Sequence, residues 1–236
     1  MLNRKINLEG TNNTRDIGGL QTTTGITTNF GAYFRSDSIA RLTPLDVDFL
    51  LEKNLETIVD MRSRDELCNT ELKALNDKSI HYHWIPIELN SKCERNLCLS
   101  KIYINLLETQ KAALCEVFNI LANAKGLCLY NCNGGKDRTG IVSMLVLDIA
   151  NVKMDFIIGD YMETEANMKL IFAEVSKRIE QKKCNIPIGG LQCAPQFVSD
   201  TLGYIRQRYT SSRNYLNNIG VTNDAINMIL KRLLPN

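Results

Sequence analysis

Short apolar runs alternate with longer amphipathic segments along the first part of the chain. Three runs rich in β-branched and aromatic residues, at 32–36, 56–60 and 80–87, have the length and composition of buried strands, although Pro86 interrupts the third. A fourth apolar run, residues 126–131, leads directly into a cysteine. The pattern therefore predicts four strands, the last of which ends at a cysteine.

Helical periodicity separates these strands and then dominates the rest of the chain. Thr43 and Pro44 form a helix start, with an N-cap threonine before a proline at the first helical position. Residues 1–31 are polar and loop-like, and Gly18 and Gly19 are turn signals within them. Helices are predicted at 43–53, after Ser63, at 97–124, at 141–150 and at 153–183, and the helix at 97–124 is expected to break once near Thr109. A loop at 186–195 then leads to three terminal helices that end at Leu234.

Strands that alternate with helices are typical of an α/β fold with a largely parallel central sheet flanked by helices. The later helices predict an extra C-terminal helical layer. The 236 residues, 44% of them hydrophobic, are enough for the core of a single domain covering 1–236, in which 153–236 is mainly helical. Ligands bind at the carboxyl ends of parallel strands. Asp60 and Cys132 both follow predicted strands, so we expect them to line one crevice.

Composition limits the classes of binding partner and the cellular compartment that we expect for this chain. A net charge of +2 predicts no broad attraction to nucleic acid or to an anionic membrane. The N-terminus lacks the apolar core of a signal peptide, and no stretch approaches the ~20 apolar residues of a membrane span, so we expect no stable membrane insertion. The eight cysteines include no Cys-x-x-Cys pair, which favours a reducing compartment. We expect a cytoplasmic protein, and a monomer.

The stretch after the fourth predicted strand carries the chemistry. It reads Cys132-Asn133-Gly134-Gly135-Lys136-Asp137-Arg138-Thr139-Gly140. A loop of this length around an anion points successive backbone N–H groups inward, and the positive end of the following helix faces the same point. The two adjacent glycines permit positive φ and close approach to phosphate oxygens. A phosphate site is therefore predicted at Asn133, Gly134, Gly135, Lys136, Asp137, Arg138 and Thr139.

Three side chains of this loop suit nucleophilic attack on a phosphate monoester. Arg138 can bind two phosphate oxygens with its guanidinium group. The same positive field favours a thiolate at Cys132. The hydroxyl of Thr139 can donate to the sulfur and ease its departure from a phosphoenzyme.

Two other interpretations of the loop fit the sequence less well. A nucleotide-binding P-loop needs Ser or Thr after the lysine and Gly five residues before the second Gly, but those positions hold Asp137 and Tyr130. A buried structural cysteine at a strand end is common. The adjoining Gly-Gly-Lys-Asp-Arg-Thr-Gly run is hard to explain in that way.

The loop resembles that of the bacterial atypical tyrosine phosphatases, Cys-x5-Arg enzymes whose loop ends Gly-Lys-Asp-Arg-Thr-Gly. The likeness extends over nearly the whole chain. Matching segments lie at 13–19, 33–36, 41–43, 59–63, 160–161, 208–209, 215–216 and Gly220. From residues alone, the 13–19 segment is either a turn held by a local salt bridge or a direct substrate contact.

The resemblance implies a cysteine-phosphatase-like fold and activity on phosphotyrosine, with weaker phosphoserine and phosphothreonine activity and, in some members, phosphoinositide activity. It implies a two-step mechanism through a cysteinyl-phosphate, without metal or other cofactor. Lys136 resembles the loop lysine that lipid-dephosphorylating members use for extra negative charge. The other interpretation of Lys136 is a solvated charge beside the anion.

The general acid has three candidates. Many tyrosine phosphatases carry it on a Trp-Pro-Asp loop, but no aspartate follows the single tryptophan, Trp84. Family precedent points to Asp137, and strand-end position makes Asp60 the second candidate. Glu88 is the third.

One departure from the family pattern concerns the residue before the cysteine, which is Asn131 instead of the usual histidine. Asparagine donates hydrogen bonds but carries no positive charge. We therefore predict an active enzyme whose Cys132 thiol ionises less readily than in relatives. A phospho-binding module that has lost turnover remains the alternative.

Two weaker patterns lie elsewhere. His81 and His83 share one strand face at metal-ligand spacing, but with no third histidine we predict polar surface. Cys184 and Cys193 flank a loop, and we expect free thiols there.

Overall fold

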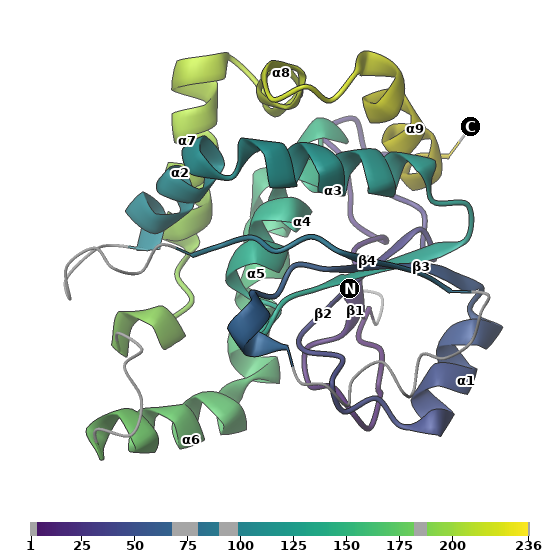
Figure 1. The fold of residues 1–236 in the computed structure, drawn as a ribbon. Helices are drawn as coiled ribbons and strands as arrows, with labels where there is room; N and C mark the ends of the chain where they lie inside the picture. Colours follow the sequence, from purple (N-terminus) through teal and green to yellow (C-terminus); the bar gives the residue numbers. More distant parts are fainter. Residues whose placement is uncertain (1–3, 68–79, 90–98, 182–187, 236) are drawn as a thin grey trace.

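The structure, a computed structural model, describes residues 4–67, 80–89, 99–181 and 188–235 (Figure 1). Within these residues the sheet has the order β1-β2-β5-β3-β4. β1 runs antiparallel to β2, and the other neighbours are parallel. This arrangement confirms the predicted α/β class. The strands are β1 (Arg15–Asp16), β2 (Tyr33–Ser36), β3 (Leu55–Asp60), β4 (His81–Trp84) and β5 (Leu127–Asn131).

Helices connect these strands and then form the C-terminal part of the described chain. α9 packs against α3, and α7 packs against α2 and α5. Two short 3-10 turns, η1 and η3, lie at Arg64–Glu66 and Ile188–Leu191. The α-helices are α1 (Pro44–Glu52), α2 (Leu99–Thr109), α3 (Lys111–Asn123), α4 (Asp137–Ile149), α5 (Met154–Asn167), α6 (Lys169–Glu180), α7 (Pro195–Tyr209), α8 (Ser212–Asn218) and α9 (Asn223–Leu233).

Several boundaries differ from the predictions. The predicted break near Thr109 separates α2 from α3, but 153–183 also divides, at Met168, where the backbone leaves helical geometry with ψ of 6°. β4 ends at Trp84, earlier than predicted, although Ile85 N and Ile87 N still donate to Asp60 O and Met61 O at 2.9 and 3.2 Å on either side of Pro86. β1 was not predicted, since the pairing of two charged residues with a distant strand leaves no local apolar signal.

The sheet separates two apolar clusters of unequal size. Figure 1 shows α1 on one face of the sheet and α3, α4, α8 and α9 on the other. Strand alternation sorts the side chains, so that Ile58 and Leu129 face α1 while Val59, Cys128 and Tyr130 face the larger cluster. α4 follows the loop from Cys132 to Arg138, packs within the larger cluster and is buried along almost its whole length. In the described residues no helix combines the length and apolar content needed to cross a membrane.

A buried cluster of charges joins the N-terminal region to α5. The Asp160 carboxylate accepts hydrogen bonds from Arg4 at 2.9 Å, from Arg15 at 3.2 Å and from Arg35. These four side chains are at most 3% exposed. Burial alone would raise the pKa of Asp160, but the three guanidinium charges outweigh it and hold the pKa well below its usual range. The Asp160 carboxylate is therefore the centre of the cluster, and the partly exposed Glu163 pairs with Arg4 and Arg15 at its edge.

We predict that Asp160→Asn lowers the free energy of unfolding by about 3–5 kcal/mol at pH 7, because it removes the buried charge that pairs with Arg35 and leaves Arg4 and Arg15 with only the partly exposed Glu163. The depressed pKa means that the wild-type advantage is complete above the ordinary aspartate pKa of about 4 and is lost progressively as the pH falls from there through the lower pKa of the folded state. Urea unfolding followed by circular dichroism, from pH 7 down to about pH 2, measures the loss at neutral pH and the onset of the acid dependence.

Arg206→Gln serves as the control, because it breaks an ion pair with Asp148 whose arginine is 47% exposed. We expect it to change stability by less than about 1 kcal/mol. Equal losses in the two variants would contradict the importance of the buried cluster.

Candidate active site

Three parallel strands bring the predicted site residues to one edge of the sheet. Asn131, the last residue of β5, pairs with Ser36 of β2 on one side and with Asp60 of β3 on the other. Cys132 follows directly and is 2% exposed. The predicted crevice residues Asp60 and Cys132 therefore lie at the same carboxyl edge.

The loop from Cys132 to Arg138 is held from its outer side. Asn13 Nδ2 donates to the carbonyl oxygens of Gly134 and Gly135 at 3.1 and 3.2 Å, and Arg35 Nη2 donates to Gly135 O at 2.8 Å. In a planar trans peptide the N–H points opposite to the C=O. The amides that follow these two carbonyls are therefore directed toward the inside of the loop, where an anion would lie.

Only one of the two loop glycines adopts the expected positive φ. Gly135 has φ of +62°, and a Cβ there would lie 2.7 Å from Ser36 O. Gly134 is not among the residues with positive φ, and a Cβ there would meet nothing within 4 Å. The backbone conformation and the close approach thus both require glycine at 135.

The 13–19 segment supports the loop through side chains other than those expected. Arg15 pairs with Asp160 rather than with its neighbour Asp16. The Asp16 carboxylate accepts the backbone N–H groups of Gly18 and Gly31, both at 2.7 Å. The segment is therefore no turn closed by a local salt bridge, and its contact with the loop is made by Asn13.

Arg138, on the first turn of α4, is fixed by a carboxylate that the sequence analysis did not identify. Its two terminal nitrogens donate to the Glu66 carboxylate at 2.6 and 2.7 Å. Burial alone would lower the pKa of Arg138, but Glu66 and the nearby Cys132 raise it. In the described part of the chain Arg138 Nε is buried without a partner, as is Thr139 Oγ1. Two buried polar atoms at the end of the loop thus lack a hydrogen-bond partner among the described residues.

Asp137 is the first residue of α4 and is 24% exposed. Its Oδ1 accepts a hydrogen bond of 2.6 Å from the hydroxyl of Tyr103, on α2, and lies 3.3 Å from Lys136 Nζ. Tyr103 was not predicted either. An α2 residue reaches this loop only through the folded helical layer, so no local pattern could have identified it.

Lys136 is neither solvated nor directed to an empty space. Its side chain is 2% exposed, and Nζ donates to the carbonyl oxygens of Gly190, in η3, and Gln192. The chain after α6 thus covers the amine.

Asp60 lies beneath the loop and is completely buried. It forms an ion pair with Arg62 and accepts hydrogen bonds from Tyr82 Oη at 2.8 Å and Asn131 Nδ2 at 3.2 Å. Asn131 Oδ1 is buried without a partner among the described residues. Glu88, by contrast, is exposed beyond the end of β4.

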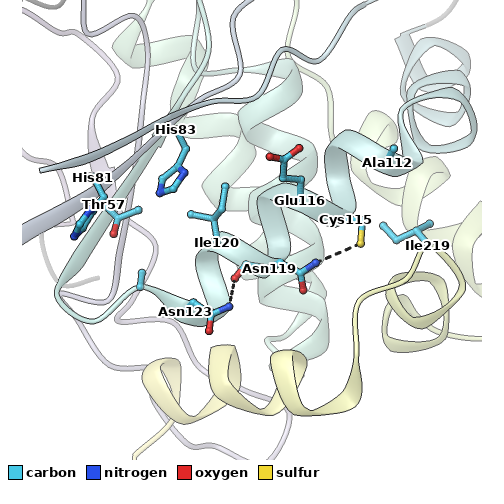
Figure 2. Close-up of a pocket in the computed structure, with 11 residues that line it drawn as sticks. Thr57, His81, His83, Ala112, Cys115, Glu116, Asn119, Ile120, Asn123 and Ile219 are labelled. Atoms are coloured by element: carbon cyan, nitrogen blue, oxygen red, sulfur yellow. Dashed lines mark hydrogen bonds between the residues drawn. The ribbon is translucent and has the colours of Figure 1, made fainter.

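The two histidines line a separate pocket of about 630 Å³ between β4 and α3 (Figure 2). His81 begins β4, so the pocket opens toward the amino end of that strand, away from the Cys132 loop. Cys115, Glu116 and Asn119 of α3 form its other wall. The described residues contain no group of three His, Cys, Asp or Glu side chains able to hold a metal. Cys184 lies outside the described residues.

The sequence matches one known protein family and several curated proteins. A sequence model of the tyrosine phosphatase family matches residues 6–235. A tyrosine-protein phosphatase of Nostoc commune is 25% identical over 218 residues, which cover 86% of this chain and 74% of that protein. The triple specificity protein phosphatase PtpB of Mycobacterium tuberculosis is 27% identical over 135 residues, 52% of this chain and 49% of that protein.

Among solved structures, the catalytic core of Siw14 has a TM-score of 0.45 at 18% identity, covering 75% of this chain and 95% of that one. TpbA of P. aeruginosa has a TM-score of 0.39 at 13% identity, covering 86% and 96%. The family match spans nearly the whole sequence and includes the Cys-x5-Arg loop. The chain therefore belongs to the tyrosine phosphatase family and is a phosphatase.

Proposed function

We propose that this phosphatase hydrolyses phosphate monoesters, above all phosphotyrosine in proteins, through a cysteinyl-phosphate on Cys132 and without a metal ion. The observation that carries the proposal is the loop from Cys132 to Arg138. Its outer carbonyls are bound by Asn13 and Arg35, and its buried Arg138 Nε has no acceptor in the described structure. A phosphoryl group supplies the acceptor oxygens that inward N–H groups and this guanidinium need.

In the first step the thiolate of Cys132 attacks phosphorus, and the bond from phosphorus to the leaving oxygen breaks. Asp137 donates its proton to that oxygen, so the alcohol or phenol leaves neutral. In the second step water attacks the cysteinyl-phosphate, and the Asp137 carboxylate takes a proton from it. The S–P bond breaks, inorganic phosphate leaves, and the thiolate is regenerated with Thr139 as donor to the sulfur.

Asp137 is favoured as the acid over Asp60 and Glu88 because of burial and position. A general acid must reach the leaving oxygen. Asp137 lies in the loop and is 24% exposed, while Asp60 is fully buried in its ion pair with Arg62. Glu88 is exposed, outside the loop.

A phosphoinositide is the second candidate substrate, supported by the positive charge of Lys136 next to the phosphate site. Because the Lys136 amine is bound by the carbonyls of Gly190 and Gln192, phosphotyrosine is placed first. The mycobacterial relative is named a triple specificity phosphatase, so more than one substrate class should be assayed. A thiolate nucleophile must stay reduced, which favours the cytoplasm as compartment.

The first prediction for this site concerns turnover. Phosphate release from a phosphotyrosine peptide should exceed that from a phosphothreonine peptide and from phosphoinositides, and Cys132→Ser should abolish all of it, because a serine hydroxyl is a far weaker nucleophile here. Cys115→Ser, a matched change on α3 in the separate pocket, should retain full activity. No Cys132-dependent release from any substrate would leave a phospho-binding module as the function.

The second prediction separates the acid candidates. Asp137→Asn should lower kcat/KM for phenyl phosphate about 10²–10³-fold, since its phenolate needs a proton to leave. The loss should be much smaller for p-nitrophenyl phosphate, whose phenolate leaves readily. Glu88→Gln should change neither rate. Asp60→Asn should mainly lower stability, by about 3 kcal/mol, because it removes the buried carboxylate that accepts hydrogen bonds from Arg62, Tyr82 and Asn131.

The assignment of the acid is wrong under one outcome. In that outcome Asp60→Asn folds stably and loses more kcat/KM with phenyl phosphate than with p-nitrophenyl phosphate, while Asp137→Asn shows no such difference between the substrates.

The third prediction concerns Asn131. In Asn131→His an imidazole would take the place of an amide that donates to Asp60, and its positive form would favour the neighbouring thiolate. Inactivation by iodoacetate should therefore reach its half-maximal rate at a lower pH in Asn131→His than in the wild type. Identical profiles would mean that the residue before Cys132 does not govern ionisation of the thiol.

A further inference from the structure

A chain of two buried hydroxyl groups ends on Asp137. Tyr103 Oη lies 2.6 Å from Asp137 Oδ1 and 2.7 Å from the hydroxyl of Tyr161. Tyr103 comes from α2 and is 0% exposed, and Tyr161 comes from α5 and is 1% exposed. A hydroxyl group from α2 thus contacts the proposed acid directly, and a hydroxyl group from α5 is linked to it through Tyr103.

The direction of this chain follows from counting protons. An ionised carboxylate only accepts hydrogen bonds, so Tyr103 must give its single O–H proton to Asp137. The contact between the two tyrosines then requires Tyr161 to donate to Tyr103. Burial raises the pKa of Tyr103 well above its ordinary value, and the charge of Asp137 raises it further. Tyr103 therefore stays protonated and acts as a hydrogen-bond donor throughout.

The ring positions are fixed as firmly as the hydroxyl groups. The Tyr103 ring packs edge-on against Tyr161 and against Phe197 of α7, with centroids 6.3 and 6.4 Å apart. A Cβ on Gly140, one turn along α4 from Asp137, would lie 3.2 Å from the Tyr161 ring. The donor chain is thus built into the packing of α2, α4, α5 and α7.

The two carboxylate oxygens of Asp137 are not equivalent as a result. Oδ1 receives the Tyr103 hydroxyl and lies near Lys136 Nζ, and both of these groups are donors. A proton on Oδ1 would face two other protons, so the acid form carries its proton on Oδ2. When that proton leaves, negative charge develops on a carboxylate that already receives a hydrogen bond, and such bonds strengthen as the acceptor becomes charged.

We propose that Tyr103, supported by Tyr161, is a positioning residue for catalysis that holds Asp137 with its proton on Oδ2, facing the leaving group. The inference rests on the proposed role of Asp137 as general acid. It assigns to α2 and α5 a part in proton transfer although neither contributes to the phosphate loop.

Steady-state kinetics of Tyr103→Phe with two substrates test the proposal. We expect kcat/KM to fall about 10-fold for phenyl phosphate, the loss expected for one hydrogen bond to a charged group, and less than about 3-fold for p-nitrophenyl phosphate. The inhibition constant of inorganic phosphate should not change, because the phosphate loop is untouched. Tyr161→Phe, one hydrogen bond further away, should show the same pattern with a smaller loss.

Tyr215→Phe is the matched control. This tyrosine is also fully buried, and its hydroxyl donates to Leu107 O of the same helix α2 at 2.7 Å, so the variant removes a comparable hydrogen bond without touching Asp137. We expect it to alter thermal stability but neither substrate's kcat/KM. If Tyr103→Phe does not fold, Tyr161→Phe carries the same comparison.

Asp137→Asn, alone and combined with Tyr103→Phe, distinguishes a failure of the role of Tyr103 from a failure of the assignment of Asp137 as the general acid. If Tyr103 acts through Asp137, the double variant should be no slower on phenyl phosphate than Asp137→Asn alone. Equal losses on both substrates, a changed phosphate inhibition constant, or a full additional loss in the double variant would overturn the role of Tyr103. If Asp137→Asn itself lacks leaving-group dependence, the acid assignment fails, and this inference fails with it.

Discussion

Arg35 makes the connection on which the arrangement of the site depends. One end of its guanidinium group binds Asp160 at the centre of the buried charge cluster, and the other donates to the Gly135 carbonyl in the phosphate loop. The loop is thereby tied to the same carboxylate that holds Arg4 and Arg15. Buried charges are costly unless they are paired. The same set of paired charges therefore holds the N-terminal region against α5 and fixes the shape of the loop.

Burial divides the three aspartates near the site into different tasks. Asp160 and Asp60 are enclosed among arginine, tyrosine and asparagine side chains and serve as fixed counter-charges. Asp137 alone of the three keeps a quarter of its side chain exposed, so it can exchange a proton with a substrate or with water. A carboxylate of the same chemical type is thus structural or reactive according to its neighbours and its access to solvent.

Patterns among neighbouring residues predicted the strands and the loop, but not the contacts between distant segments of the chain. The apolar runs at 56–60 and 126–131 identified two central strands, and the spacing from Cys132 to Arg138 identified the loop. Glu66 and Tyr103 escaped prediction because each acts across a distance in sequence, Glu66 on Arg138 and Tyr103 on Asp137. Ser63 and Glu66 form a local hydrogen bond at the start of η1. This local pattern predicts the turn, but it does not predict the ion pair of Glu66 with Arg138.

Gly135 has a consequence for ligand binding. Its left-handed backbone and the bonds that Asn13 and Arg35 make to the loop carbonyls are contacts that the protein itself supplies to shape the loop. Binding a phosphoryl group then requires little reorganisation of the backbone, so little of the interaction energy is consumed in ordering the loop. On the proposed function, such a loop would recognise a tetrahedral dianion by its oxygens alone. Free phosphate released at the end of each turnover would then compete directly with the next substrate.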